Sequence, residues 1–185
     1  MHTLKRTRLL PLIVFFLGIS LTAKPTYYYM KGICAQLLLE KAWSITKRTG
    51  NSSKAWSWAD TLPVAKLQIP IINLNQIVLG GEEIEAMAFG PAIIESSLES
   101  SNVIIAGHRD SFFRNLGELI EGDIIKLEKI GKKISYKISN IIITDPLDIK
   151  WLKQDLDDRI TLITCYPFNF IGEAPMRYIL VGKSY

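Results

Sequence analysis

The sequence predicts an all-β fold, a closed or nearly closed β-barrel with short helices, preceded by an N-terminal transmembrane helix. Hydrophobic residues make up 48% of the 185 residues, which is enough to build a packed core. Beyond residue 62, short runs rich in Ile and Val alternate with Gly, Pro, Asn and Asp, a pattern typical of strands and turns. Closing many short strands into a barrel removes their exposed edges.

The first thirty residues are predicted to form a cytoplasmic tip and a membrane anchor. Three basic residues within the first eight precede an apolar run over residues 9–23. Those 15 residues are fewer than the roughly 20 that span a bilayer, so an anchor helix would have to extend through residues 26–30. Basic residues before the helix place the N-terminus in the cytoplasm and the rest of the chain outside it.

A cleaved signal peptide is the alternative interpretation of this apolar run. Cleavage after Ala23 would need a small side chain at the third residue before the cut, and that residue is Leu21. We therefore favour the uncleaved anchor.

The distribution of charge argues against nucleic acid as a partner. Residues 1–54 hold nine Lys or Arg and one acidic residue, a net charge of +8. Residues 55–185 hold thirteen Lys or Arg and seventeen acidic residues, a net charge of −4. A mildly acidic globular part lacks the basic patch that a nucleic acid requires.

Two further regions are predicted after the anchor. Residues 31–62 form a membrane-proximal helix, over 31–47, and a polar linker without periodicity. Residues 63–185 form the β-barrel domain, with a helical turn near 112–120. The predicted strands are residues 64–69, 73–79, 102–106, 123–127, 133–144, 159–165 and 176–181.

Two cysteines, Cys34 and Cys165, allow one disulfide in a protein that leaves the cytoplasm. We favour two unpaired thiols, with Cys34 a buried structural thiol of the ordinary kind. Metal ligation is poorly supported, because two histidines (His2 and His108) and two scattered cysteines do not make a tetrahedral site of ordinary spacing. No cofactor is expected.

Three residues with suitable chemistry lie at predicted strand ends. His108 follows an apolar strand and Gly107, Cys165 ends a strand before Pro167, and Arg177 opens the last strand. A thiolate forms and releases acyl intermediates, an imidazole transfers protons near neutral pH, and a guanidinium stabilises an oxyanion. A thioester formed this way could be resolved by an amine or by water.

Each of these residues alone would usually be structural: a core thiol, a hydrogen-bonded histidine, a surface ion pair. A membrane-tethered β-barrel that binds a peptide through a non-catalytic Cys and His therefore stays open as an alternative.

The motifs around these residues resemble those of the sortase family over roughly residues 63–183. Residues 161–165 (TLITC) resemble the TLxTC signature, residues 107–109 (GHR) the strand-end histidine motif, and Arg177 the third catalytic residue. Residues 58–61 (WADT) and 88–91 (AFGP) resemble features of the class found in Gram-negative bacteria.

This resemblance implies a sortase-type closed barrel of about eight strands with Cys165 and Arg177 on neighbouring strands. It implies a cysteine transpeptidase that cleaves an LPxTG-like sorting signal, at the C-terminus of a partner protein, between Thr and Gly. The acyl group would then pass to an amine acceptor. The enzyme would sit in the inner membrane with its catalytic domain in the periplasm.

Two finer expectations remain open at this point. Residues 145–158 border the substrate groove if the resemblance holds, and would tune specificity, or they form a solvated acidic loop. Asp110 orients His108 or Arg109, or it is a surface turn residue, which we favour.

Overall fold

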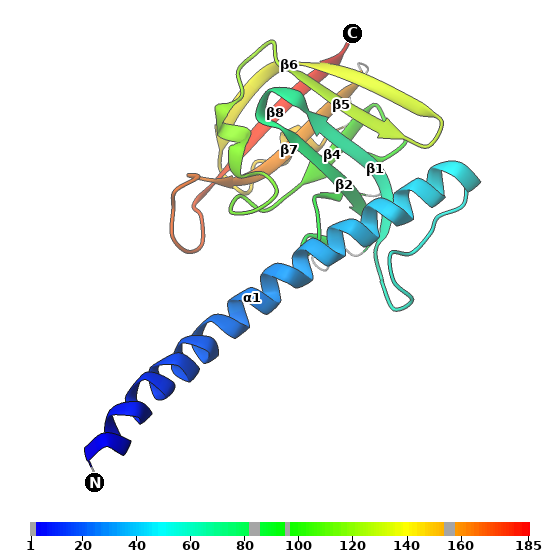
Figure 1. Cartoon of the computed structure of the whole chain (residues 1–185). Coiled ribbons are helices and arrows are strands. Elements are labelled where there is room, and N and C mark those ends of the chain that lie inside the picture. Colours follow the sequence, from blue (N-terminus) through cyan, green and yellow to red (C-terminus); the bar gives the residue numbers. More distant parts are fainter. Residues whose placement is uncertain (1–2, 82–85, 95–96, 154–157) are drawn as a thin grey trace. The chain divides into compact units, whose positions relative to one another are not determined.

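The structure is a computed structural model that describes residues 3–81, 86–94, 97–153 and 158–185. The chain divides into two compact units, residues 1–37 and residues 38–185. Helix α1 (Thr3–Thr49) begins in the first unit and ends in the second (Figure 1).

The first unit consists of the N-terminal part of α1, so the predicted anchor and the predicted membrane-proximal helix are one continuous helix. In the described part of the chain, no helix is long and apolar enough to cross a membrane. The anchor therefore stays a prediction. Cys34 is exposed, which makes the expectation of a buried thiol wrong, because a single helix has no core of its own.

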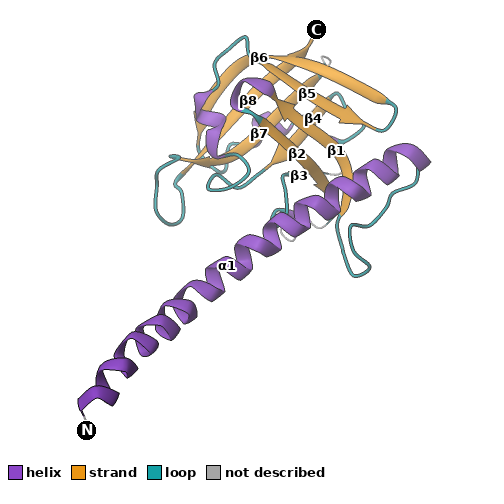
Figure 2. Ribbon diagram, viewed as in Figure 1, coloured by secondary structure: helices purple, strands orange, loops and turns teal. Residues whose placement is uncertain are grey.

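The second unit contains a closed barrel of eight strands within the residues that the structure describes (Figure 2). Around the barrel the order is β1-β2-β3-β4-β7-β8-β6-β5. The strands are β1 (Leu62–Ile69), β2 (Leu74–Gly80), β3 (Ala92–Ile93), β4 (Asn102–Ala106), β5 (Ile124–Lys129), β6 (Lys132–Thr144), β7 (Arg159–Tyr166) and β8 (Met176–Ser184). The closed barrel predicted from the sequence is confirmed.

Two of the strand pairs are parallel, β2 with β3 and β4 with β7, and the others are antiparallel. The barrel closes where Leu67 of β1 pairs with Leu127 of β5. The β4–β7 pair joins segments that lie far apart in the sequence, and it brings the ends of both strands to one end of the barrel.

The barrel interior is filled by alternate side chains of its strands. In β1, buried and half-buried residues alternate along the whole strand, as expected for a strand with one face on the core. Ala65, Leu67 and Ile69 point inward and are fully buried, and they contact residues from β5, β7 and β8 in one continuous cluster.

The last turns of α1 cover the outside of β2, which is therefore buried on both faces. Leu39 and Trp43 of the helix pack against Ile77 and Leu79 of β2 and against Ala92 of β3. Because both faces of β2 are covered, its last four residues are all buried and show no alternation.

All seven predicted strands are present, with ends that differ by at most three residues, and β4 has both ends as predicted. The predicted helical turn is the 3-10 helix η3 (Arg114–Glu118), and two more 3-10 helices, η1 (Pro70–Ile72) and η4 (Ile149–Leu152), were not predicted. The eighth strand, β3, was missed because two residues carry no periodicity.

Candidate active site

The parallel pairing of β4 with β7 brings His108 beside Cys165. Ala106 is the register partner of Ile163, and the Gly107 amide donates to the Ile163 carbonyl at 3.1 Å. The Thr164 hydroxyl donates to the Gly107 carbonyl at 2.7 Å. His108 follows directly after these contacts, and it lines the same pocket as Cys165.

The antiparallel pairing of β7 with β8 brings Arg177 to the other side of the thiol. Cys165 and Arg177 are direct register partners, and both side chains are half-buried. Cys165 and Arg177 therefore lie on the neighbouring strands β7 and β8, as the resemblance implied, and His108 lies in the turn that follows the adjacent strand β4.

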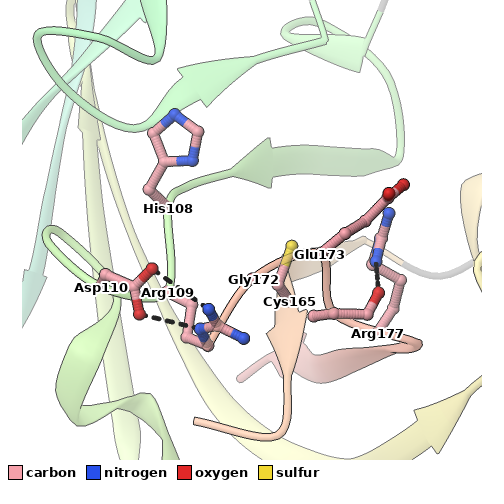
Figure 3. Close-up of a pocket in the computed structure, with 8 residues that line it drawn as sticks. His108, Arg109, Asp110, Cys165, Gly172, Glu173 and Arg177 are labelled. Carbon is pink, nitrogen blue, oxygen red and sulfur yellow. Dashed lines mark hydrogen bonds and ion pairs between the residues drawn. The ribbon is translucent and has the colours of Figure 1, made fainter. Parts of the chain in front are cut away.

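These side chains surround a pocket of about 220 Å³ at this end of the barrel. Figure 3 shows the Cys165 sulfur between His108 and Arg177. Its lining residues are His108, Arg109, Asp110, Cys165, Gly172, Glu173, Ala174 and Arg177.

Cys165 is a free thiol, and among the described residues no hydrogen bond joins it to His108. Arg177 donates from Nη1 to the carbonyls of Met176 at 3.1 Å and Ala174 at 3.4 Å. These contacts hold the guanidinium at the edge of the pocket that it lines together with Cys165. Catalytic hydrogen bonds are often long in a free enzyme and tighten when substrate binds.

A glycine is required immediately before His108 because an aromatic ring occupies the space of a side chain. A Cβ at Gly107 would lie 2.7 Å from the ring of Phe113, which is fully buried. The Phe113 amide in turn donates to the His108 carbonyl at 3.1 Å. The close approach of this ring holds the turn that presents His108.

Arg109 is the principal site residue that sequence reasoning missed. Its side chain is only 6% exposed, and it donates to both carboxylate oxygens of Asp110 and to the Pro167 carbonyl. The hydrogen bond from Arg109 holds the pKa of Asp110 below its usual range, and the same bond raises the pKa of Arg109. Arg109 was visible in the GHR motif, but no feature of the local sequence indicates that its side chain is buried.

Asp110 is an exposed turn residue that pairs with Arg109 rather than with His108. Both the favoured interpretation, a surface turn, and one alternative, an orienting contact to Arg109, therefore describe it.

An aromatic cluster fixes the segment that leaves the site. Phe168 packs edge-on against Tyr178 at 5.1 Å between ring centroids, and Tyr166 stacks on Tyr178 at 6.3 Å. The Tyr178 hydroxyl donates to the Leu116 carbonyl at 3.3 Å. Because Gly117 has no side chain, η3 approaches Phe168 closely enough that a Cβ there would lie 2.8 Å from the ring.

The loop after Cys165 supplies two more pocket residues that the sequence did not single out. Gly172, with a positive φ of 100°, and the exposed Glu173 line the pocket beside Arg177. The sequence feature that could have identified them is their position in the loop between Cys165 and Arg177.

The described part of the loop over residues 145–158 begins with an ordered cap. Asp148 accepts from the Thr144 hydroxyl at 2.7 Å, and Asn102 donates to the carbonyls of Trp151 and Lys153. Leu147 is 86% exposed. Residues 154–157 lie outside the described residues, so the role expected for this loop remains a prediction.

The arrangement has the chemistry of acyl transfer: a thiol, an imidazole and a guanidinium around one pocket. Among the residues that the structure describes, no three His, Cys, Asp or Glu side chains lie together as they would to hold a metal ion.

Comparison with known proteins gives a family match over most of the barrel. A family model described as the sortase domain matches residues 67–185. Sortase D of Bacillus subtilis is 34% identical over 122 residues, which cover 63% of this chain and 61% of that protein. Sortase A of Listeria monocytogenes is 25% identical over 126 residues, covering 65% and 55%. The match thus spans less than two thirds of either relative.

Solved structures share the same fold. Sortase C-1 from Actinomyces oris superposes with a TM-score of 0.60 at 25% identity, covering 66% of this chain and 74% of that one. A Clostridium perfringens sortase D5 transpeptidase superposes with a TM-score of 0.65 at 23% identity, covering 82% and 98%.

Proposed function

Because this chain belongs to the sortase family, we propose that it is a membrane-anchored cysteine transpeptidase with Cys165 as its nucleophile. The observation that carries the proposal is that His108, Cys165 and Arg177 line one pocket, where Cys165 and Arg177 are register partners of β7 and β8 and His108 follows β4. Hydrogen-bonded strands are rigid and hold Cys165 and Arg177 in place, while the hydrogen bond from the Phe113 amide to the His108 carbonyl fixes the turn that carries His108.

In the first half of the reaction, the Cys165 thiolate attacks the Thr carbonyl carbon of an LPxTG-like sorting signal. Negative charge develops on the carbonyl oxygen, where the Arg177 guanidinium stabilises it. The C–N bond to Gly breaks as His108 donates its proton to the departing nitrogen. A thioester on Cys165 remains.

In the second half, an amine acceptor attacks the thioester carbonyl. His108, now neutral, takes a proton from the attacking nitrogen, and the C–S bond breaks to return the thiolate. The product is a new amide between the partner protein and the amine. Water in place of the amine would give hydrolysis through the same intermediate.

We extend the proposal to class and location. The residues around 58–61, 88–91, 107–110 and 164–168 resemble the class of Gram-negative bacteria. The basic tip and apolar run support an inner-membrane anchor with the barrel in the periplasm. A partner carrying the sorting signal at its own C-terminus would be the substrate.

A fluorogenic LPxTG-type peptide, added to the full chain in detergent micelles, tests this function. Cleavage should require Cys165, while Cys34→Ala should retain full activity as the matched control. His108→Ala should lower the rate on the order of 10²- to 10⁴-fold. Arg177→Ala should lower it on the order of 10²- to 10³-fold, with Arg48→Ala, an exposed arginine at the end of α1, as its control.

If a panel of sorting peptides binds but none is cleaved by the folded wild type, and thiol reagents leave Cys165 unmodified, the chain is a peptide-binding barrel instead. A catalytic thiol reacts with electrophiles in the folded protein, whereas a structural thiol does not.

A further inference from the structure

Arg109 is a charged residue that is buried at the end of the barrel that carries the pocket. Of the side chains that the structure describes, it is the one charged side chain that is buried. Its Nε and Nη2 atoms donate to the two Asp110 oxygens at 2.9 and 3.2 Å, and Nη1 donates to the Pro167 carbonyl at 2.9 Å. All three nitrogens of the guanidinium are therefore engaged.

These bonds connect the two segments that carry the candidate catalytic groups. Arg109 follows His108 directly, and Pro167 comes two residues after Cys165. The β4–β7 register ends at Ala106 and Ile163, and only the Gly107 contacts extend it. Beyond that point, the bond from Arg109 to Pro167 joins the two segments next to the candidate catalytic groups, and the close approach of Gly117 to Phe168 joins them farther along.

The guanidinium also borders the reacting space. Arg109 lines the same pocket as Cys165, and Figure 3 shows its guanidinium on the thiol side of the turn, with the His108 ring on the other. Its partner Asp110 is 72% exposed, and an ion pair with an exposed partner contributes little to folding. Stability alone thus gives a weak reason to bury an arginine here.

We propose that Arg109 is a positioning residue of this site: it ties the His108 turn to the segment that follows Cys165 and so sets the position of the imidazole relative to the thiol. This inference rests on the proposed transpeptidase function. Lysine cannot replace arginine in this role, because an ammonium lacks the planar fork that bonds Asp110 and Pro167 together.

The test compares Arg109→Lys and Arg109→Gln with the wild-type full chain in detergent. Both variants should lose kcat for peptide cleavage on the order of 10- to 100-fold, with KM changed by less than about threefold, because alignment rather than peptide binding is impaired. Alkylation of Cys165 by iodoacetamide should stay near the wild-type rate in Arg109→Lys, because lysine keeps the positive charge that lines the pocket beside the thiol.

Asn102→Ala is the structural control. Asn102 is buried at the opposite end of β4, so its loss should lower the melting temperature and leave kcat near wild type. Asp110→Asn keeps the Pro167 bond available and should lose less kcat than Arg109→Gln.

Three results would overturn the inference. One is wild-type kcat in folded Arg109→Lys and Arg109→Gln. Another is that Asn102→Ala loses as much kcat as the Arg109 variants for the same drop in melting temperature, which would indicate that Arg109 has only a structural role. The third is a matching loss of alkylation rate in Arg109→Lys, which would place the defect in the thiol. A wild type that turns over no sorting peptide would refute the proposed function itself, and the positioning role with it.

Discussion

Asp148 holds the end of β6 next to the active-site pocket. Its carboxylate accepts from the Thr144 hydroxyl at 2.7 Å and from the Lys150 amide at 3.3 Å, and it pairs with the Lys150 ammonium at 2.9 Å. Thr144 is the register partner of Arg177 in the β6–β8 ladder. One side chain therefore links the loop after β6 to the end of β6, which is paired with the strand that presents Arg177.

These contacts make Asp148 a source of pH-dependent stability. The hydrogen bonds from Lys150 and Thr144 lower its pKa from 3.8 to about 2. A carboxyl with a depressed pKa in the folded state adds stability above its unfolded pKa, and this is lost as the pH falls through the folded pKa. Asp148→Asn should therefore be less stable than wild type at pH 6, and the gap should close between about pH 4 and pH 2.

Urea midpoints measured from pH 6 to pH 2 would test this. Asp145→Asn, which removes the same charge from the same loop, controls for net charge. A gap between wild type and Asp148→Asn that stays constant down to pH 2 would show that the carboxylate contributes no ionic stabilisation.

At the scale of single residues, the candidate catalytic residues could be predicted from the sequence, but the residues that hold them in position could not. Cys165, His108 and Arg177 stand out because of their types and their places at strand ends. Burial of Arg109 and the capping role of Asp148 depend on where two distant loops meet, and local sequence contains no measure of that distance. Cys34 was predicted buried and is exposed, because its burial would have required a packing partner.

At the scale of elements, two threonines of β7 join it to β4 through their side chains. The Thr161 hydroxyl donates to the Asn102 side chain at 2.7 Å, and the Thr164 hydroxyl donates to the Gly107 carbonyl at 2.7 Å. Both threonines are buried. Their distances from the nucleophile differ. Thr164 directly precedes Cys165, whereas Thr161 lies four residues before it.

Substitution of these two threonines distinguishes an effect on the stability of the fold from an effect on the position of His108. Thr164→Val and Thr161→Val should each cost about 1–3 kcal/mol of unfolding free energy, because each leaves a buried acceptor without its donor. Only Thr164→Val should also lower kcat for peptide cleavage, since the Gly107 carbonyl precedes His108. Equal kcat values in the two variants would contradict the view that the β4–β7 contacts align the site.

Elements with a clear pattern were predictable, and those defined by their neighbours were not. The seven longer strands show β-branched runs bounded by turn residues. Strand β3 has two residues and exists because Leu79 of β2 and Ala106 of β4 flank Ala92. The parallel pairing of β4 with β7 joins residues 57 positions apart, as the Thr164–Gly107 bond shows. No local pattern specifies such a partner.

At the scale of the whole molecule, the end of α1 belongs to the compact unit that contains the barrel. That unit begins at Leu38, and the predicted barrel domain begins at residue 63. Leu39 and Trp43 are buried at 0% and 2% exposure against the outer face of β2. A chain cut inside the linker would expose that apolar face.

A fragment of residues 38–185 should therefore be more stable than a fragment of residues 55–185. Removal of a large buried aromatic residue typically costs roughly 3–5 kcal/mol, and the shorter fragment also loses Leu39. Urea unfolding of both fragments measures the difference. Trp43→Ala in the longer fragment should fall between them, and Ser44→Ala, an exposed neighbour, should match the parent. Equal stability of the two fragments would contradict this packing.

The central claim is that Cys165 forms an acyl-enzyme with a sorting peptide. The most direct measurement is the intact mass of the full chain in detergent after mixing with an LPxTG-type peptide, with Cys165→Ala and Cys34→Ala in parallel. We expect an adduct of the N-terminal peptide fragment on wild type and Cys34→Ala, absent from Cys165→Ala and discharged by hydroxylamine. An adduct that persists in Cys165→Ala, or turnover of the peptide without any adduct on Cys165, would contradict the account.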